Sequence, residues 1–129
     1  MVLLVEDDPD IRGAMAEALH DEGYEVAMAI HGQEGLRVLA ALEAPCLVLL
    51  DLEIPRVDGR AFLERLRTDA RFEGTRVLGM TGEPEPAPPG VVGMLLKPVK
   101  LTTLLAAVAK HCPVPDPGSV KPPRTGEAG

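Results

Sequence analysis

Residues 46–59 read CLVLLDLEIPRVDG, an apolar run that ends in a carboxylate and is followed by a predicted turn marked by Pro55 and Asp58-Gly59. A carboxylate at the end of a buried strand is costly unless another group pairs with it. The run VLLV at 2–5 also ends in carboxylates, at Glu6, Asp7 and Asp8. Two strands that end in this way predict one shared acidic pocket, of the kind that suits a hard divalent cation with oxygen ligands.

Strand-like and helix-like segments alternate along the rest of the chain. The expected strands cover 2–5, 24–29, 46–50, 76–80 and 91–96, and the expected helices cover about 9–22, 32–43, 59–70 and 101–112. The residues expected on the inner faces of these helices are Ile11, Ala14, Met15, Ala18 and Leu19; Leu36, Leu39 and Ala40; Phe62, Leu63 and Leu66; and Leu101, Leu104, Leu105 and Val108. This alternation predicts an α/β fold with a parallel sheet covered by helices on both faces.

Four residues with reactive or charged side chains lie at the ends of predicted strands. They are Asp7, Asp51, Thr81 and Lys97. Because ligands of open α/β sheets bind outside the carboxyl ends of the strands, we expect all four residues at one edge of the sheet.

Two segments depart from the alternating pattern. Residues 83–90 read EPEPAPPG, where a helix should connect the fourth and fifth strands, and proline does not fit a helix interior. We therefore expect an extended strap at this place. Residues 113–129 are rich in proline and glycine, which predicts a disordered tail or linker after a folded domain of residues 1–112.

Composition limits the classes of function. The chain has 129 residues, which suits one domain, and no apolar run has the length of a membrane span. The net charge of −7 does not favour direct binding to nucleic acid. Cys46 and Cys112 are too few for a disulfide framework, and no signal peptide precedes the first strand, so we expect a reduced, cytoplasmic protein.

Together, four motifs resemble the receiver domain of two-component response regulators. They are VLLVEDDPDIR (2–12), LVLLDLEIPRVDG (47–59), MTG (80–82) and LKP (96–98). The resemblance implies a flavodoxin-like, doubly wound sheet of five parallel strands in the order 2-1-3-4-5. About four helices would flank the sheet, with the fourth helix of the family missing or degenerate.

The resemblance also implies a function and a set of site residues. Asp51 would accept a phosphoryl group from a histidine kinase or phosphotransfer protein, and the domain would pass the signal to a protein target. Thr81 would hydrogen-bond the phosphoryl group and Lys97 would pair with it. The ligands of Mg²⁺ would be Glu6, Asp7, Asp51 and the backbone carbonyl of Glu53. Such a domain phosphorylates itself from a donor and is not an enzyme with turnover.

The chain departs from the family pattern at its output side, which leaves alternatives open. The family has an aromatic residue where this chain has Met94, and the interval from Thr81 to Lys97 is shorter than usual. One alternative is a receiver-like interaction module that works without phosphorylation. Another is a phosphatase of the haloacid-dehalogenase type, because Asp51 and Glu53 resemble its nucleophile and acid. The sequence does not give the sign of the effect of Glu53 on the lifetime of the phosphoryl group.

Overall fold

A single five-stranded parallel sheet forms the centre of the molecule, with strand order β2-β1-β3-β4-β5. The structure is a computed structural model and describes residues 1–42, 47–54 and 56–112. The strands are β1 (Val2–Val5), β2 (Val26–Ala29), β3 (Leu47–Asp51), β4 (Val77–Thr81) and β5 (Val91–Leu96). The helices are α1 (Pro9–Asp21), α2 (Gly32–Ala41), α3 (Arg56–Thr68), the 3₁₀ turn η1 (Ala70–Phe72) and α4 (Leu101–His111). This order confirms the predicted flavodoxin-like topology.

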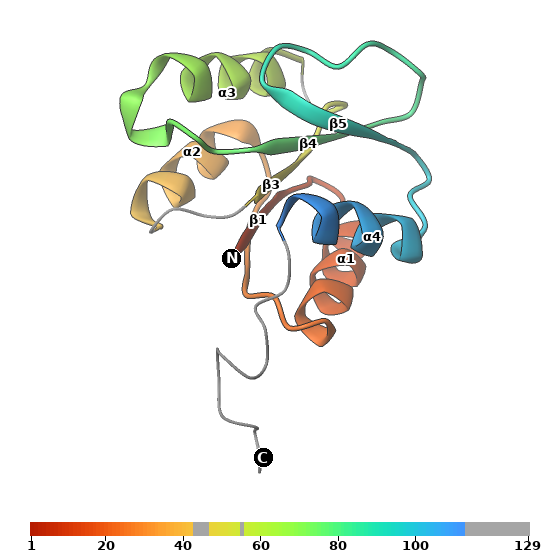
Figure 1. Ribbon diagram of the computed structural model, residues 1–129. Coiled ribbons are helices and arrows are strands. Elements are labelled where there is room, and N and C mark those ends of the chain that lie inside the picture. The colour runs from red at the N-terminus through yellow and green to blue at the C-terminus, as the bar shows by residue number, and fades with distance from the viewer. Residues whose placement is uncertain (43–46, 55, 113–129) are drawn as a thin grey trace.

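The sheet separates two aliphatic cores. Because successive strand residues point to opposite faces, Leu4 of β1 packs on the side of α1 and α4, and Leu3 packs on the side of α2 and α3. Figure 1 shows these helix pairs on opposite sides of the strands. All four residues of β1 and all five of β3 are buried, as a sheet covered on both faces requires.

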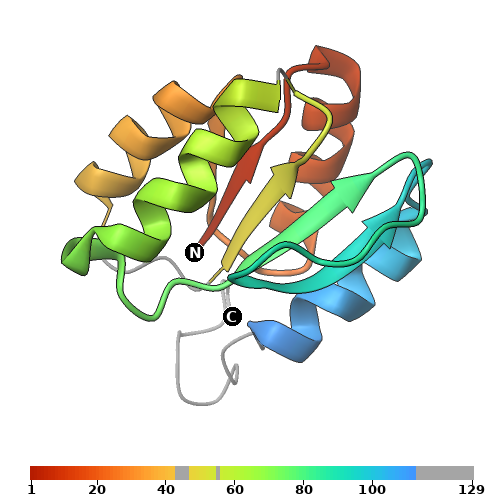
Figure 2. The same cartoon turned by 90° about the horizontal axis from the view of Figure 1, so that it is seen from above.

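No helix connects β4 to β5 among the described residues, which include the whole connection. Residues 83–90, which we call the strap, contain neither helix nor strand. Figure 2, seen from the side of α2 and α3, shows β4 and β5 beside these helices with no helix over them. The strap therefore leaves one face of β5 open, and Val92 and Leu96 are 45% and 53% exposed.

Several element boundaries and inner-face residues differ from the predictions. The third helix begins at Arg56 and not at Gly59, so the turn predicted at Asp58-Gly59 is wrong. Ile11 is 39% exposed and Leu101 is 41% exposed, although both have helical spacing with buried residues. Ala14 and Ala40 are exposed as well. The predicted turn residue Pro55 and the predicted tail 113–129 lie outside the described residues.

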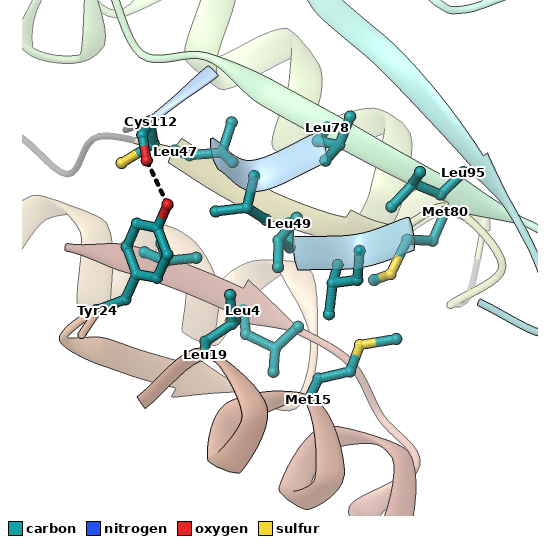
Figure 3. Packing of buried hydrophobic residues seen from close by; sticks show 13 residues of the cluster. Leu4, Met15, Leu19, Tyr24, Leu47, Leu49, Leu78, Met80, Leu95 and Cys112 are labelled. Atoms are coloured by element: carbon teal, nitrogen blue, oxygen red, sulfur yellow. Dashed lines mark hydrogen bonds between the residues drawn. The ribbon is translucent and has the colours of Figure 1, made fainter. Parts of the chain in front are cut away.

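The first and last helices are joined at the end of the sheet away from the predicted site. The Tyr24 hydroxyl, in the turn after α1, donates a hydrogen bond of 2.6 Å to the backbone carbonyl of Cys112 (Figure 3). Burial raises the pKa of Tyr24 above its ordinary value. Both residues pack in the same core cluster as Leu19 and Leu47. This contact fixes the end of α4 to the turn between α1 and β2.

Cys112 is buried and is disulfide-bonded, so the expectation of a reduced thiol is wrong for this residue. Cys46, the first residue of the expected strand 46–50, lies outside the described residues. Within the described part of the chain, none of the helices has the length and apolar character that crossing a membrane requires.

Candidate functional site

Asp51 is the central residue of the candidate site. It is the last residue of β3 and is only 2% exposed. Its Oδ1 atom accepts a hydrogen bond of 2.8 Å from the backbone N–H of Glu53 and lies 2.8 Å from Nζ of Lys97. The buried carboxylate is thus compensated by a positive charge and by a backbone donor, as burial of a charge requires.

Lys97 approaches Asp51 from the end of β5. Its backbone N–H donates to the carbonyl of Thr81 at 2.7 Å, and a cis peptide bond joins it to Pro98. Partial burial on its own would lower the pKa of Lys97, but the hydrogen bond and charge of Asp51 outweigh this effect, with help from Glu53, and the pKa is raised. Lys97 is therefore a firmly protonated cation beside the Asp51 carboxylate.

Glu6 and Asp7 complete an acidic group at the end of β1. Glu6 is 1% exposed, and its Oε2 atom accepts a hydrogen bond of 3.1 Å from the backbone N–H of Asp8. Burial raises the pKa of Glu6 from 4.5 to about 7, with a further rise from the charge of Asp51, against the lowering effects of the Asp8 hydrogen bond and of Lys97.

This acidic group has the composition of a site for a hard cation. Glu6, Asp7 and Asp51 each contribute one carboxylate oxygen, and these three oxygens lie within 4.8 Å of one another. Among the described residues, Glu6 Oε1 is the buried side-chain atom that lacks a hydrogen-bond partner. A divalent cation with oxygen ligands would satisfy this atom and compensate the carboxylates, so the residues present fit such an ion.

Thr81 ends β4 and is 3% exposed. Its hydroxyl donates a hydrogen bond of 2.8 Å to Oε2 of Glu85, and the carbonyl oxygen of Glu83 lies 3.2 Å from the Thr81 hydroxyl oxygen. The backbone N–H of Glu83 donates to the hydroxyl at 3.3 Å. Thr81 therefore holds the beginning of the strap against the end of the sheet.

Glu53 contributes its side chain to the site through two contacts that were not predicted from the sequence. Its Oε2 atom accepts a hydrogen bond of 2.6 Å from the backbone N–H of Gly82, and its Oε1 atom lies 3.2 Å from Nζ of Lys97. The Gly82 hydrogen bond, followed by the contact with Lys97, lowers the pKa of Glu53. Glu53 is thus ionised at neutral pH. The resemblance to receiver domains implied a metal-binding role for the backbone carbonyl of this residue and left the effect of its carboxylate open.

The structure groups Glu6, Asp7, Asp51, Glu53 and Lys97 by direct contacts or short distances, and it places Thr81 at the same edge of the sheet with its hydroxyl bonded to the strap. Their side chains come from the ends of β1, β3, β4 and β5, at the carboxyl edge of the sheet. Gly82 and Glu85, which bond to Glu53 and Thr81 respectively, were not among the site residues predicted from the sequence. A local signal was available for Gly82, since a residue that follows a strand and has no side chain allows a close approach to its N–H.

Comparison with known proteins identifies the family. The family model of the response regulator receiver domain matches residues 2–109. This chain is a response regulator receiver domain. Sporulation initiation phosphotransferase F of Bacillus subtilis is 34% identical over 119 residues, which cover 88% of this chain and 94% of that protein.

The chain also matches part of a longer response regulator and the solved structure of a chemotaxis protein. Response regulator Rre1 of Synechocystis sp. is 39% identical over 88 residues, covering 64% of this chain and 38% of that protein. The chain thus spans about two fifths of this relative. The chemotaxis protein CheY4 of Vibrio cholerae has the same fold, with a TM-score of 0.77, 29% identity, and coverage of 85% of this chain and 96% of that one.

Proposed function

We propose that Asp51 accepts a phosphoryl group from the phosphohistidine of a cytoplasmic histidine kinase or phosphotransfer protein, in a reaction that depends on Mg²⁺. The observation that carries this proposal is the 2.8 Å contact between the Lys97 ammonium and Asp51 Oδ1, beside the carboxylates of Glu6 and Asp7. A cation next to a nucleophilic carboxylate, within reach of a group that binds metal, is an arrangement that suits phosphoryl transfer.

In the proposed reaction an Asp51 carboxylate oxygen attacks the phosphorus atom. The new P–O bond forms as the P–N bond to the donor imidazole breaks, and the imidazole nitrogen keeps the electron pair. Lys97 stabilises the negative charge on one phosphoryl oxygen, and the Thr81 hydroxyl donates to another. Mg²⁺, held by Glu6, Asp7, Asp51 and the carbonyl of Glu53, would supply further charge neutralisation when bound. Each phosphoryl transfer modifies Asp51 of the domain itself, so the reaction is not the turnover of a separate substrate.

The phosphorylation proposal is tested by intact-mass measurement. We expect acetyl phosphate and Mg²⁺ to add the mass of one phosphoryl group to the wild-type chain, and to add nothing to Asp51→Asn. Asp21→Asn, which removes an exposed carboxylate at the end of α1, is the matched control and should be modified like the wild type. If the wild type gains no mass from acetyl phosphate or from a phosphorylated histidine donor, the domain is an interaction module that works without phosphorylation. The open face of β5, where no helix follows β4, favours this second function.

As part of the same proposal, the strap and α4 form the output surface for a protein target. Thr81 supports this assignment, because its hydroxyl cannot donate its one hydrogen fully to both Glu85 and a phosphoryl group. Phosphorylation would therefore free Glu85 and the strap. Hydrogen exchange with and without beryllofluoride tests the assignment. The strap amides that can report it are those of Glu83, Glu85, Ala87 and Gly90, because the other four strap residues are prolines without N–H groups. Unchanged protection across 82–112 would contradict it.

A further inference from the structure

Two donors at the carboxyl edge of the sheet, one of them paired with Asp51, are already occupied by a carboxylate of the protein itself. The Gly82 N–H bonds to Glu53 Oε2 at 2.6 Å, and the Lys97 ammonium lies 3.2 Å from Glu53 Oε1. The same ammonium lies 2.8 Å from Asp51 Oδ1. Glu53 therefore places an anionic group among the donors that a second anion bound to Asp51 would need.

We infer that the Glu53 carboxylate is an internal competitor of the phosphoryl group and occupies the Gly82 N–H and the Lys97 ammonium in the resting state. This inference rests on the proposed function of Asp51. A carboxylate and a phosphoryl group are both strong acceptors for charged and backbone donors, and two anions that share one ammonium repel each other. Phosphorylation of Asp51 consequently requires Glu53 to leave, and the 44% exposure of its side chain gives it access to water.

The position of the Glu53 carboxylate depends on the glycine at position 82. A Cβ atom added to Gly82 would lie only 2.5 Å from Glu53 Oε2, far inside normal contact distance. The clashing atom is the end of a flexible side chain, so Gly82→Ala should displace the carboxylate without disturbing the backbone. This substitution keeps the N–H of residue 82 and the negative charge of Glu53. It therefore separates occupation of the donors from simple charge repulsion.

The resting contact is tested in the absence of metal and phosphoryl analogue. The amide proton of Gly82, which donates a short hydrogen bond to a carboxylate, should resonate downfield in a ¹H–¹⁵N spectrum. In Glu53→Ala we expect an upfield shift of this signal, while Glu83→Gln, which removes a neighbouring negative charge, leaves it nearly unchanged. A Gly82 signal that does not respond to Glu53→Ala overturns the inference.

Competition is tested by titrating each protein with beryllofluoride in the presence of Mg²⁺, followed by the chemical shifts of the β3 and β4 amides. We expect Glu53→Ala and Gly82→Ala to bind the analogue about fivefold to tenfold more tightly than the wild type, and Glu83→Gln to change the affinity by less than about twofold. Gly13→Ala is the control for an added methyl group, because a Cβ at Gly13 has no neighbour within 4 Å.

Each outcome of this titration decides the inference. Tighter binding by both Glu53→Ala and Gly82→Ala supports competition for the donors. Tighter binding by Glu53→Ala alone assigns the effect to charge and overturns the inference. Wild-type affinity in both variants also overturns the inference. If no protein binds beryllofluoride and the wild type is not phosphorylated, the proposed function itself fails, which is distinct from failure of the Glu53 contact in the resting spectrum.

Discussion

Glu6 is a buried carboxylate whose protonation is linked to the stability of the metal-free protein. Folding raises its pKa from 4.5 to about 7, chiefly through burial. Between these pH values the folded state binds more protons than the unfolded chain, so the free energy of unfolding falls as the pH rises. The contribution of protonated Glu6 to the free energy of unfolding is fully present below about pH 4.5 and is lost as the pH rises through about 7.

At the residue scale we predict that Glu6→Gln reduces this pH dependence. Glutamine cannot ionise, so in the presence of a chelator the variant should gain stability relative to the wild type from pH 5 to pH 8, by up to about 3 kcal/mol. Thermal unfolding followed by circular dichroism at several pH values measures the difference. Parallel pH profiles for the two proteins would contradict the prediction.

The residues of the site show how far sequence reasoning reaches. Asp51 and Lys97 were placed correctly because the carboxyl ends of parallel strands share one edge, so a fold-level rule brings distant residues together. The side-chain contacts of Glu53 and Glu85 were not predictable in this way. They depend on rotamers and on the path of the strap, which no periodicity of the sequence encodes.

At the element scale, helix α2 packs closely because it carries a glycine where it crosses the sheet. A Cβ at Gly35 would lie 3.0 Å from Phe62 Cε1 and 3.1 Å from Val5 Cγ2. Gly13 of α1, by contrast, is exposed, and a Cβ atom added there would have no neighbour within 4 Å. The two glycines therefore provide opposite tests of packing and of helix propensity.

We predict that Gly35→Val lowers the free energy of unfolding by about 1–3 kcal/mol through overpacking. Gly13→Ala should raise it by about 0.5–1 kcal/mol, because alanine loses less backbone entropy in a helix. Urea unfolding followed by circular dichroism measures both. A Gly35→Val protein as stable as the wild type would show that α2 does not approach β1 and α3 as described.

The elements that sequence patterns predicted least well have identifiable physical reasons. Apolar spacing placed Ile11 on the inner face of α1, yet its position in the first turn leaves it beyond the edge of the core, 39% exposed. The start of α3 was predicted too late because Asp58-Gly59 resembles a turn, whereas both residues lie inside the helix. Burial of Phe62 and Leu63 on the same helix followed its periodicity and was predicted correctly.

At the scale of the whole molecule, an acidic chain with a net charge of −7 gathers three carboxylates at one edge of its sheet. A cation bound there stabilises the folded state alone and so shifts the unfolding of the entire domain. We predict that millimolar Mg²⁺ raises Tm by several degrees, corresponding to about 2.7 kcal/mol at a hundredfold excess over Kd.

Circular dichroism melts with and without Mg²⁺ check this prediction, and Asp7→Asn should remove most of the shift. Asp21→Asn, the exposed carboxylate at the end of α1, should keep the full shift. An equal Tm with and without millimolar Mg²⁺ in the wild type would count against the acidic group as a metal site.

The contact of Tyr24 with the end of α4 has a spectroscopic consequence. The chain has one tyrosine and no tryptophan, so all of its tyrosine emission arises from a single buried ring. Tyr24 follows α1 and bonds to the residue after α4, at the opposite end of the sheet from Asp51. A change in tyrosine emission when an analogue binds at Asp51 would therefore report motion transmitted along the full length of the strands, with no label attached to the protein.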